Sequence, residues 1–114
     1  MEVQGLYAVA NVDDLPRSEE YYTKLLGRGP DDRPIDGMIQ WRGFGSAGIQ
    51  LFADQEKAGQ SVMTIVTPDI EETQRKLAEE NIELGEIQRG PFGALAQLFD
   101  PDGNRINLAE PPKR

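Results

Sequence analysis

Apolar and polar residues follow a pattern that divides the chain into two similar halves. Segments in which every second residue is apolar, or in which a short apolar run is bounded by turn residues, predict β-strands. In the first half these segments are 5–12, 38–41 and 49–53, and in the second half they are 61–67, 84–89, 95–99 and 105–109. One segment in each half instead repeats its apolar residues at helical spacing, so each half predicts one helix among strands.

Both predicted helices begin at an aspartate. Asp14 stands two residues before Pro16, and an aspartate ahead of a first-turn proline is typical of a helix N-terminus. Asp69 has the same place in the second half, and Gly27 follows the first helix as a C-terminal glycine does. The two helix starts are offset by about half the chain, which predicts two structural repeats, each too small to close a core alone.

The fold class that this pattern predicts is α+β, with two βαβββ modules that form curved mixed or antiparallel sheets. We interpret 1–114 as a single domain, because this length is common for one domain. Module one spans 1–54, the polar segment 55–59 is a linker, and module two spans 60–110. The tail 111–114 is expected to be frayed.

A turn signature, Asp100-Pro101-Asp102-Gly103-Asn104, separates the last two predicted strands. Pro101 presets φ for a turn, and Gly103 supplies a position of positive φ. This hairpin, with the helix starts at 13–18 and 67–70, resembles the glyoxalase/bleomycin-resistance/extradiol-dioxygenase superfamily, which has the vicinal-oxygen-chelate fold. The resemblance covers nearly the whole chain and implies that the two sheets surround a cup.

In the metal enzymes of that superfamily, four inward-facing residues, typically His, Gln or Glu, meet one ion in the cup. The resemblance places these positions at Tyr7, Gln50, Val62 and Asn107. Val62 has no donor atom, and the amides of Gln50 and Asn107 are neutral, whereas hard divalent ions require several oxygens with negative charge among them. We therefore expect a member of the superfamily that lacks metal ligands and uses no cofactor.

Composition restricts the chemistry further. The chain has no histidine and no cysteine, so it lacks both the imidazole base and the thiolate nucleophile. Its net charge of −8 disfavours nucleic acid and anionic membranes as partners and favours neutral or cationic ligands. No apolar run approaches the length of a membrane helix, and the N-terminus lacks signal-peptide features, so we expect a cytoplasmic protein.

The cup is the predicted ligand site. Tyr7, Gln50 and Asn107 supply hydrogen-bonding groups, and Phe52 and Val62 supply apolar contact. The alternative is that these side chains fill a closed core, in which the amides must be satisfied by each other or by water. Trp41 precedes a glycine-rich loop, and it either stacks on a planar ligand at the rim of the cup or packs in the core or in a dimer contact.

The favoured function is that of a metal-independent small-molecule-binding protein, similar to the drug-sequestering branch of the superfamily, which sequesters a natural product or drug. One alternative is a lyase or isomerase that works without metal or with an unusual ion, in which Tyr7 is the acid. Another is a structural or regulatory dimer with a vestigial cup. Related proteins usually pair, and exposed strand edges favour pairing, so we expect a homodimer.

Overall fold

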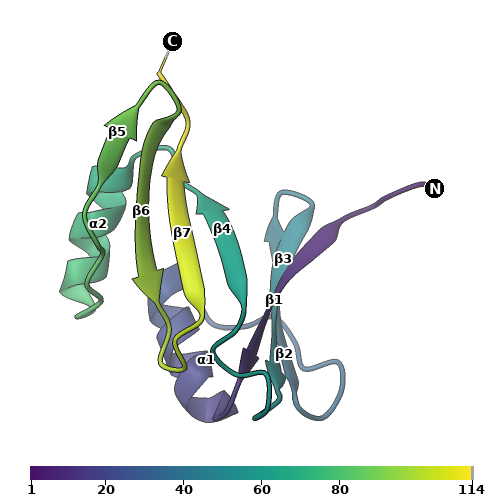
Figure 1. Ribbon diagram of the computed structural model, residues 1–114. Helices are drawn as coiled ribbons and strands as arrows, with labels where there is room; N and C mark the ends of the chain where they lie inside the picture. Colours follow the sequence, from purple (N-terminus) through teal and green to yellow (C-terminus); the bar gives the residue numbers. More distant parts are fainter. Residues whose placement is uncertain (114) are drawn as a thin grey trace.

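Two helices and seven strands make up the structure, a computed structural model that describes residues 1–113 (Figure 1). The elements of module one are β1 (Leu6–Val12), α1 (Leu15–Leu26), β2 (Met38–Phe44) and β3 (Ala47–Ala53). Those of module two are β4 (Val62–Val66), α2 (Ile70–Glu79), β5 (Gln88–Gly90), β6 (Gly93–Phe99) and β7 (Arg105–Glu110).

The strands form two mixed sheets with the same internal order. The first sheet runs β1-β3-β2 and the second runs β4-β7-β6-β5. The opening strand of each module pairs in parallel with the closing strand, and the other pairs are antiparallel. Figure 1 shows the second sheet nearly face-on with α2 behind it and the first sheet nearly edge-on. The edge strands β1 and β4 lie where the two sheets approach each other. The prediction of an α+β fold with two similar modules is confirmed.

The modules differ in one strand. The first sheet has three strands, and where the second sheet has β5 the first has only an isolated bridge between Asp32 and Gln40. Pro30 and Pro34 flank this bridge, and neither has the backbone N–H that a longer ladder requires. The segment at the outer edge of β2 therefore stays irregular.

Both helix starts lie where the aspartates predict them. The Asp14 side chain accepts a hydrogen bond from the Arg17 backbone N–H, and Asp69 accepts one from Glu72. Gly27 ends α1 at a φ of 80° and donates its N–H to Thr23, a left-handed conformation that glycine adopts without strain. Neither helix of the described chain is long and apolar enough to cross a membrane.

Three strand predictions have wrong boundaries. The predicted strand 84–89 is reduced to β5 at Gln88–Gly90, although the Gly85 N–H still donates to the Gln97 carbonyl of β6 at 2.8 Å. In contrast, β2 and β3 extend beyond the predicted 38–41 and 49–53 into the glycine-rich segment between them and leave only a tight turn. In the tail, residues 111–113 are exposed and have no regular structure, while Arg114 lies outside the described residues.

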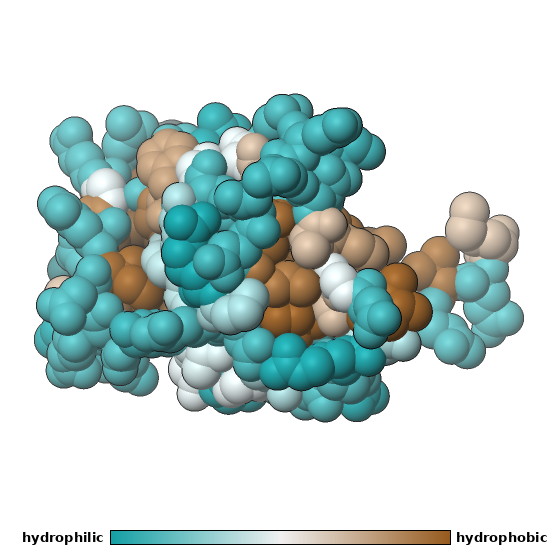
Figure 2. All heavy atoms as spheres, turned by 90° about the horizontal axis from the view of Figure 1, so that it is seen from below, coloured by the Kyte–Doolittle hydropathy of each residue, from teal (hydrophilic) through white to brown (hydrophobic). Residues whose placement is uncertain are grey.

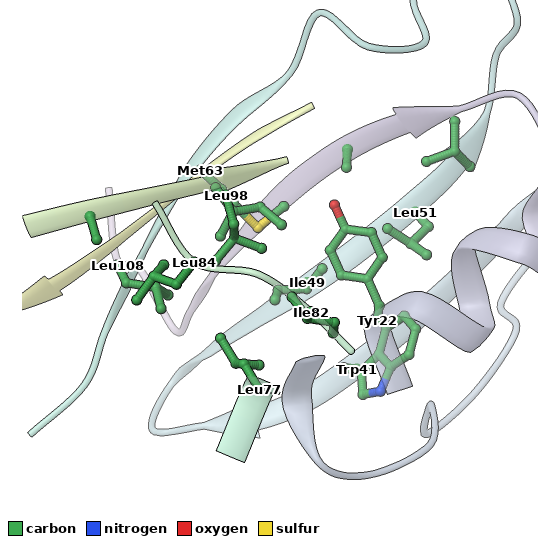
Figure 3. Packing of buried hydrophobic residues seen from close by; sticks show 14 of the residues in the cluster. Tyr22, Trp41, Ile49, Leu51, Met63, Leu77, Ile82, Leu84, Leu98 and Leu108 are labelled. Atoms are coloured by element: carbon green, nitrogen blue, oxygen red, sulfur yellow. The ribbon is translucent and has the colours of Figure 1, made fainter. Parts of the chain in front are cut away.

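The core lies between the helices and the sheet sides that they cover. Figure 3 shows Tyr22 of α1 beside Trp41 of β2, and their ring centroids are 6.2 Å apart. Further core residues come from both modules, including Leu51, Leu77, Ile106 and Leu108. Because one cluster joins both halves, neither module encloses its apolar residues alone.

Candidate functional site

Each sheet has a second side that its helix does not cover. Strand side chains alternate between sides, so the paired registers assign each residue to one side. We call the uncovered side of the first sheet the first open face; it carries Tyr7, Val9, Gln40, Gln50 and Phe52. The second open face, on the second sheet, carries Val62, Thr64, Gln97, Phe99, Arg105 and Asn107.

Five of the six predicted ligand-binding residues lie on these faces. Tyr7, Gln50 and Phe52 are on the first, and Val62 and Asn107 are on the second. Tyr7 is 42% exposed and Val62 is 55% exposed, so these side chains do not fill a closed core within the chain. The period-two pattern of the strands was sufficient to place them.

Of the positions left open for Trp41, the structure has the one in the core, so its assignment as a ligand-binding residue at the rim of the cup is wrong. Trp41 pairs with Ile49 on the helix-covered side of the first sheet and is fully buried. Its indole Nε1 donates to the Arg28 backbone carbonyl at 2.9 Å, which satisfies its only polar atom. The signal was present in the sequence, because alternation from Gln40 on the open side assigns Trp41 to the core side.

On the first open face, the amide side chains satisfy each other. Gln50 Nε2 donates to Gln40 Oε1 at 2.8 Å, and Gln40 Nε2 donates to Asp32 Oδ1 at 3.1 Å. Asp32 in turn pairs with Arg42, with 3.1 Å between Oδ2 and Nε. The hydrogen-bonding capacity of this face is therefore largely used within the chain.

On the second open face, one polar atom is left without a partner. Asn107 Nδ2 donates a long bond of 3.3 Å to Thr64 Oγ1, while Asn107 Oδ1 is enclosed and has no hydrogen-bond partner among the described residues. An unsatisfied buried acceptor costs about 1–3 kcal/mol. A buried acceptor of this kind calls for a partner outside the described residues, such as an ordered water or a bound molecule.

A cavity of about 700 Å³ opens in the gap between β1 and β4. Its walls are mainly apolar and include Leu25, Leu26, Met63 and Leu108. Its hydrogen-bonding side chains are the hydroxyls of Tyr7, Thr64, Thr67 and Thr73, and its described lining contains no carboxylate, ammonium or guanidinium group. The cavity brings Tyr7 and Thr64 together across the two modules, whereas Gln50, Phe52, Val62 and Asn107 lie outside it.

The turn that carries the sequence signature ties the modules together. The buried Asp100 carboxylate accepts from the Tyr22 hydroxyl at 2.8 Å and from Asn104 Nδ2 at 2.8 Å. Asn104 Oδ1 accepts from the Ser61 backbone N–H at 2.8 Å, and Nδ2 donates to the Asn11 carbonyl at 2.8 Å. We call Asp100, Asn104 and these partners the inter-module latch, because it joins α1, β1 and the start of module two.

Within the latch, the pKa of the Tyr22 hydroxyl is raised far above its ordinary value. The main cause is burial, followed by the negative charge of Asp100 and the hydrogen bond to it. A second contact nearby joins Asp102 to Arg17, with 3.0 Å between Oδ1 and Nη2. Sequence reasoning predicted the turn at these residues but not the latch, since the partners are distant in the chain.

The donor set at the four family metal positions does not fit a divalent ion. Tyr7, Gln50 and Asn107 supply no carboxylate or imidazole, and Val62 supplies no donor at all. Among residues 1–113, no three His, Cys, Asp or Glu side chains group closely enough to hold a metal.

Glu110, the carboxylate nearest to Asn107 in sequence, does not repair this donor set. It is 6% exposed on the helix-covered side of β7. Its Oε1 accepts from the Ile70 backbone N–H at 3.0 Å, which satisfies a free donor at the start of α2.

Comparison with known proteins agrees with this fold. The Glyoxalase/Bleomycin resistance protein/Dioxygenase superfamily matches residues 6–108, so the chain belongs to this superfamily. The resemblance noted in the sequence is thereby confirmed. A comparison with curated proteins finds no match.

Several solved structures share the fold. A glyoxalase/bleomycin resistance protein from Catenulispora acidiphila superposes with a TM-score of 0.87 at 23% identity, over 96% of this chain and 100% of that one. TnmS3, an antibiotic binding protein from Streptomyces sp. CB03234, gives a TM-score of 0.81 at 23% identity, over 98% and 97%. A bleomycin resistance determinant encoded on transposon Tn5 gives a TM-score of 0.78 at 18% identity, over 94% and 97%.

Proposed function

We propose that this chain is a metal-independent small-molecule-binding protein of the glyoxalase/bleomycin resistance type, which sequesters a natural product or drug in the cytoplasm. The observation that carries the proposal is the cavity of about 700 Å³ with apolar walls, four hydroxyl-bearing side chains and no charged group in its described lining. Its volume is in the range of pockets that enclose drug-sized ligands. Tyr7 is the only ionisable side chain of the described lining, and a lining without a carboxylate, an amine or a nucleophile–base pair suits binding better than turnover.

The open faces support the same function. Large apolar side chains on and beside them are well exposed, with Val66 at 65%, Phe99 at 57% and Val62 at 55%. Figure 2 shows apolar side chains that reach the surface between polar ones on the face seen from below. Exposed apolar patches of this kind mark ligand-binding or association surfaces.

The solved relatives add support of a general kind. One is described as an antibiotic binding protein and another as a bleomycin resistance determinant. Their identity to this chain is 23% and 18%, so the likeness concerns the fold, and the choice of ligand is our proposal.

We also propose that the functional unit is a homodimer. The outer edge of β1 has no strand partner, and both open faces leave apolar side chains in water. A second copy that covers them would enclose the ligand more fully than one chain does. Sedimentation equilibrium at micromolar concentration should give twice the chain mass of 12.7 kDa, and a monomer would refute this part.

Ligand binding is tested by filling the cavity. Ala47 lines the cavity from the start of β3 and is exposed, so Ala47→Phe reduces the volume without removing a packed group. A panel of aromatic and cationic natural products should contain compounds that raise the thermal unfolding midpoint of the wild type, and Ala47→Phe should lose this shift. Ala78→Phe, on the exposed side of α2, is the matched control and should keep it. Chemical conversion of a bound compound, detected by mass spectrometry, would instead identify an enzyme.

A further inference from the structure

Arg105 differs from the other described arginines in having no carboxylate partner. The six others each form an ion pair: Arg17, Arg28, Arg33, Arg42, Arg75 and Arg89. Among residues 1–113, no carboxylate oxygen lies within ion-pair distance of Arg105. This is unexpected in a chain with 20 acidic residues against 12 basic ones.

The neighbours of Arg105 on the second open face are apolar or neutral. Its cross-strand partners are Val62 on β4 and Phe99 on β6, which are 55% and 57% exposed. The next row along the strands consists of Thr64, Asn107 and Gln97. The Arg105 guanidinium therefore lies between exposed apolar side chains. It lacks the carboxylate partner that the other described arginines have.

The second open face meets the cavity at Thr64. This side chain lines the cavity and also accepts the hydrogen bond from Asn107 Nδ2 at 3.3 Å. Arg105 stands two residues before Asn107 on β7, which is about 7 Å along the strand. Arg105 does not itself line the cavity, so a ligand that contacts the guanidinium has to extend from Thr64 along the open face.

We propose that the sequestered ligand carries an oxyanion, such as a carboxylate, sulfonate or phosphate, on an apolar or aromatic body, and that Arg105 binds this oxyanion while Phe99 and Val62 contact the body. The inference rests on the proposed function, because it specifies the ligand of that site. Arginine suits the task because its planar guanidinium donates two parallel hydrogen bonds to one oxyanion.

This ligand class differs from the one that net charge favours. The value of −8 describes the whole chain, whereas a ligand at the second open face meets local groups first. In the described strand ladders no Asp or Glu lies on either open face, and Asp32, which an isolated bridge pairs with Gln40, is neutralised by Arg42. Arg105 is therefore the charged group that the ladders of the second open face present to a ligand, and more distant surface charges are partly screened by salt.

Two dyes with nearly the same aromatic body distinguish the contribution of the oxyanion to binding from that of the apolar contact. 8-Anilinonaphthalene-1-sulfonate carries a sulfonate, and N-phenyl-1-naphthylamine is its uncharged counterpart. Fluorescence titrations use the wild type, Arg105→Gln, Arg105→Lys and the control Arg75→Gln, which removes the same charge from the exposed side of α2. Circular dichroism and thermal unfolding verify that each variant is folded.

We expect the wild type to bind the sulfonate dye more tightly than the neutral dye. Arg105→Gln should weaken sulfonate binding about tenfold and leave the neutral dye unchanged, because the loss of a hydrogen-bonded charge pair is specific to the anion. Arg105→Lys should retain part of the preference, and Arg75→Gln should retain all of it.

The remaining outcomes overturn the inference in distinguishable ways. If both dyes bind the wild type and Arg105→Gln changes neither, or if Arg75→Gln weakens the sulfonate dye equally, the oxyanion site is wrong while the binding function stands. If neither dye binds the wild type, the proposed function fails and the inference fails with it.

Discussion

The two open faces belong to modules with the same strand order, yet they differ in whether their polar side chains have partners within the chain. On the first, Gln50, Gln40 and Asp32 form a chain of hydrogen bonds that Arg42 completes. On the second, Asn107 has an acceptor and Arg105 has a charge for which the described part of the chain supplies no partner.

This difference means that the two faces are not equally suited to binding a polar ligand. On the first face the amides of Gln40 and Gln50 are engaged within the chain, so the group of this face that lines the cavity and can meet a polar ligand is the Tyr7 hydroxyl. The second face has unused hydrogen-bonding capacity beside exposed apolar side chains, which is the combination that gives a ligand both affinity and orientation. Duplication of a module therefore does not imply duplication of a binding site.

The largest effect should come from breaking the latch that holds the two faces in one arrangement. Asn104→Ala removes the bonds to the Ser61 N–H and the Asn11 carbonyl and leaves buried groups unsatisfied. We expect the free energy of unfolding to fall by about 3 kcal/mol, which urea denaturation measures.

Asn107→Ala is the matched control for this substitution. It deletes the same amide from the second open face, where one oxygen has no partner to lose. Its cost should be below about 1 kcal/mol. Equal losses for the two variants would show that the latch does not stabilise the arrangement of the modules.

A second test uses the pH dependence that the latch confers. The pKa of Tyr22 is raised in the folded state by burial and by Asp100, while in the unfolded chain it titrates near its ordinary value of about 10. Its stabilising contribution is thus complete below pH ~10 and is lost as pH rises beyond that, by up to about 1.4 kcal/mol per pH unit.

Tyr22→Phe should have a lower free energy of unfolding at pH 8, because Asp100 loses a donor, but a shallower decline above pH ~10. The decline should not vanish, since burial also raises the pKa of Tyr21. Denaturant unfolding at several alkaline pH values measures both slopes, and identical slopes would contradict the assignment to Tyr22.

The two faces should respond to the same substitution with opposite signs. Gln50→Leu takes the donor from Gln40 Oε1, whose residue is 8% exposed, and should destabilise the fold by about 1 kcal/mol. Asn107→Leu removes an unsatisfied acceptor and should be neutral or stabilising by up to about 1 kcal/mol. The urea midpoints of the two variants test these opposite signs. A destabilised Asn107→Leu would mean that the Asn107 oxygen has a partner in solution in the wild type.

The smallest expected effect is that of a chelator. Because the positions Tyr7, Gln50, Val62 and Asn107 provide no anionic donor set, EDTA should leave the thermal unfolding midpoint unchanged. Elemental analysis that finds about one metal ion per chain, lost in Asn107→Leu, would contradict the metal-independent function.

Much of the fold follows from local signals in the sequence. Asp14, Asp69 and Gly27 mark helix ends through hydrogen bonds to nearby residues, and these signals do not depend on the rest of the molecule. The predicted strand at 84–89 is shortened to Gln88–Gly90, and how Gly85 meets the Gln97 carbonyl is a contact between segments, which a local pattern does not contain.

The site was predictable to a lesser degree. Alternation assigns Asn107 and Arg105 to one side of β7, and the structure places both on that side. Whether an acid lies opposite Arg105, or a donor opposite the Asn107 oxygen, depends on how β7 pairs with both β6 and the distant strand β4. The sequence therefore identifies which side chains share a face but not which of them lack a partner.

The latch also affects which substitutions the fold tolerates during evolution. The Asn104 amide holds the two neighbouring modules through the Ser61 N–H and the Asn11 carbonyl, which are backbone groups that nearly every amino acid provides. The orientation of the sheets is consequently insensitive to most side-chain changes on β1 and β4. Substitutions at the exposed Tyr7 or Val62 are then weakly constrained by the fold, so under the proposed binding function the scaffold is suited to acquiring new ligands by a few mutations.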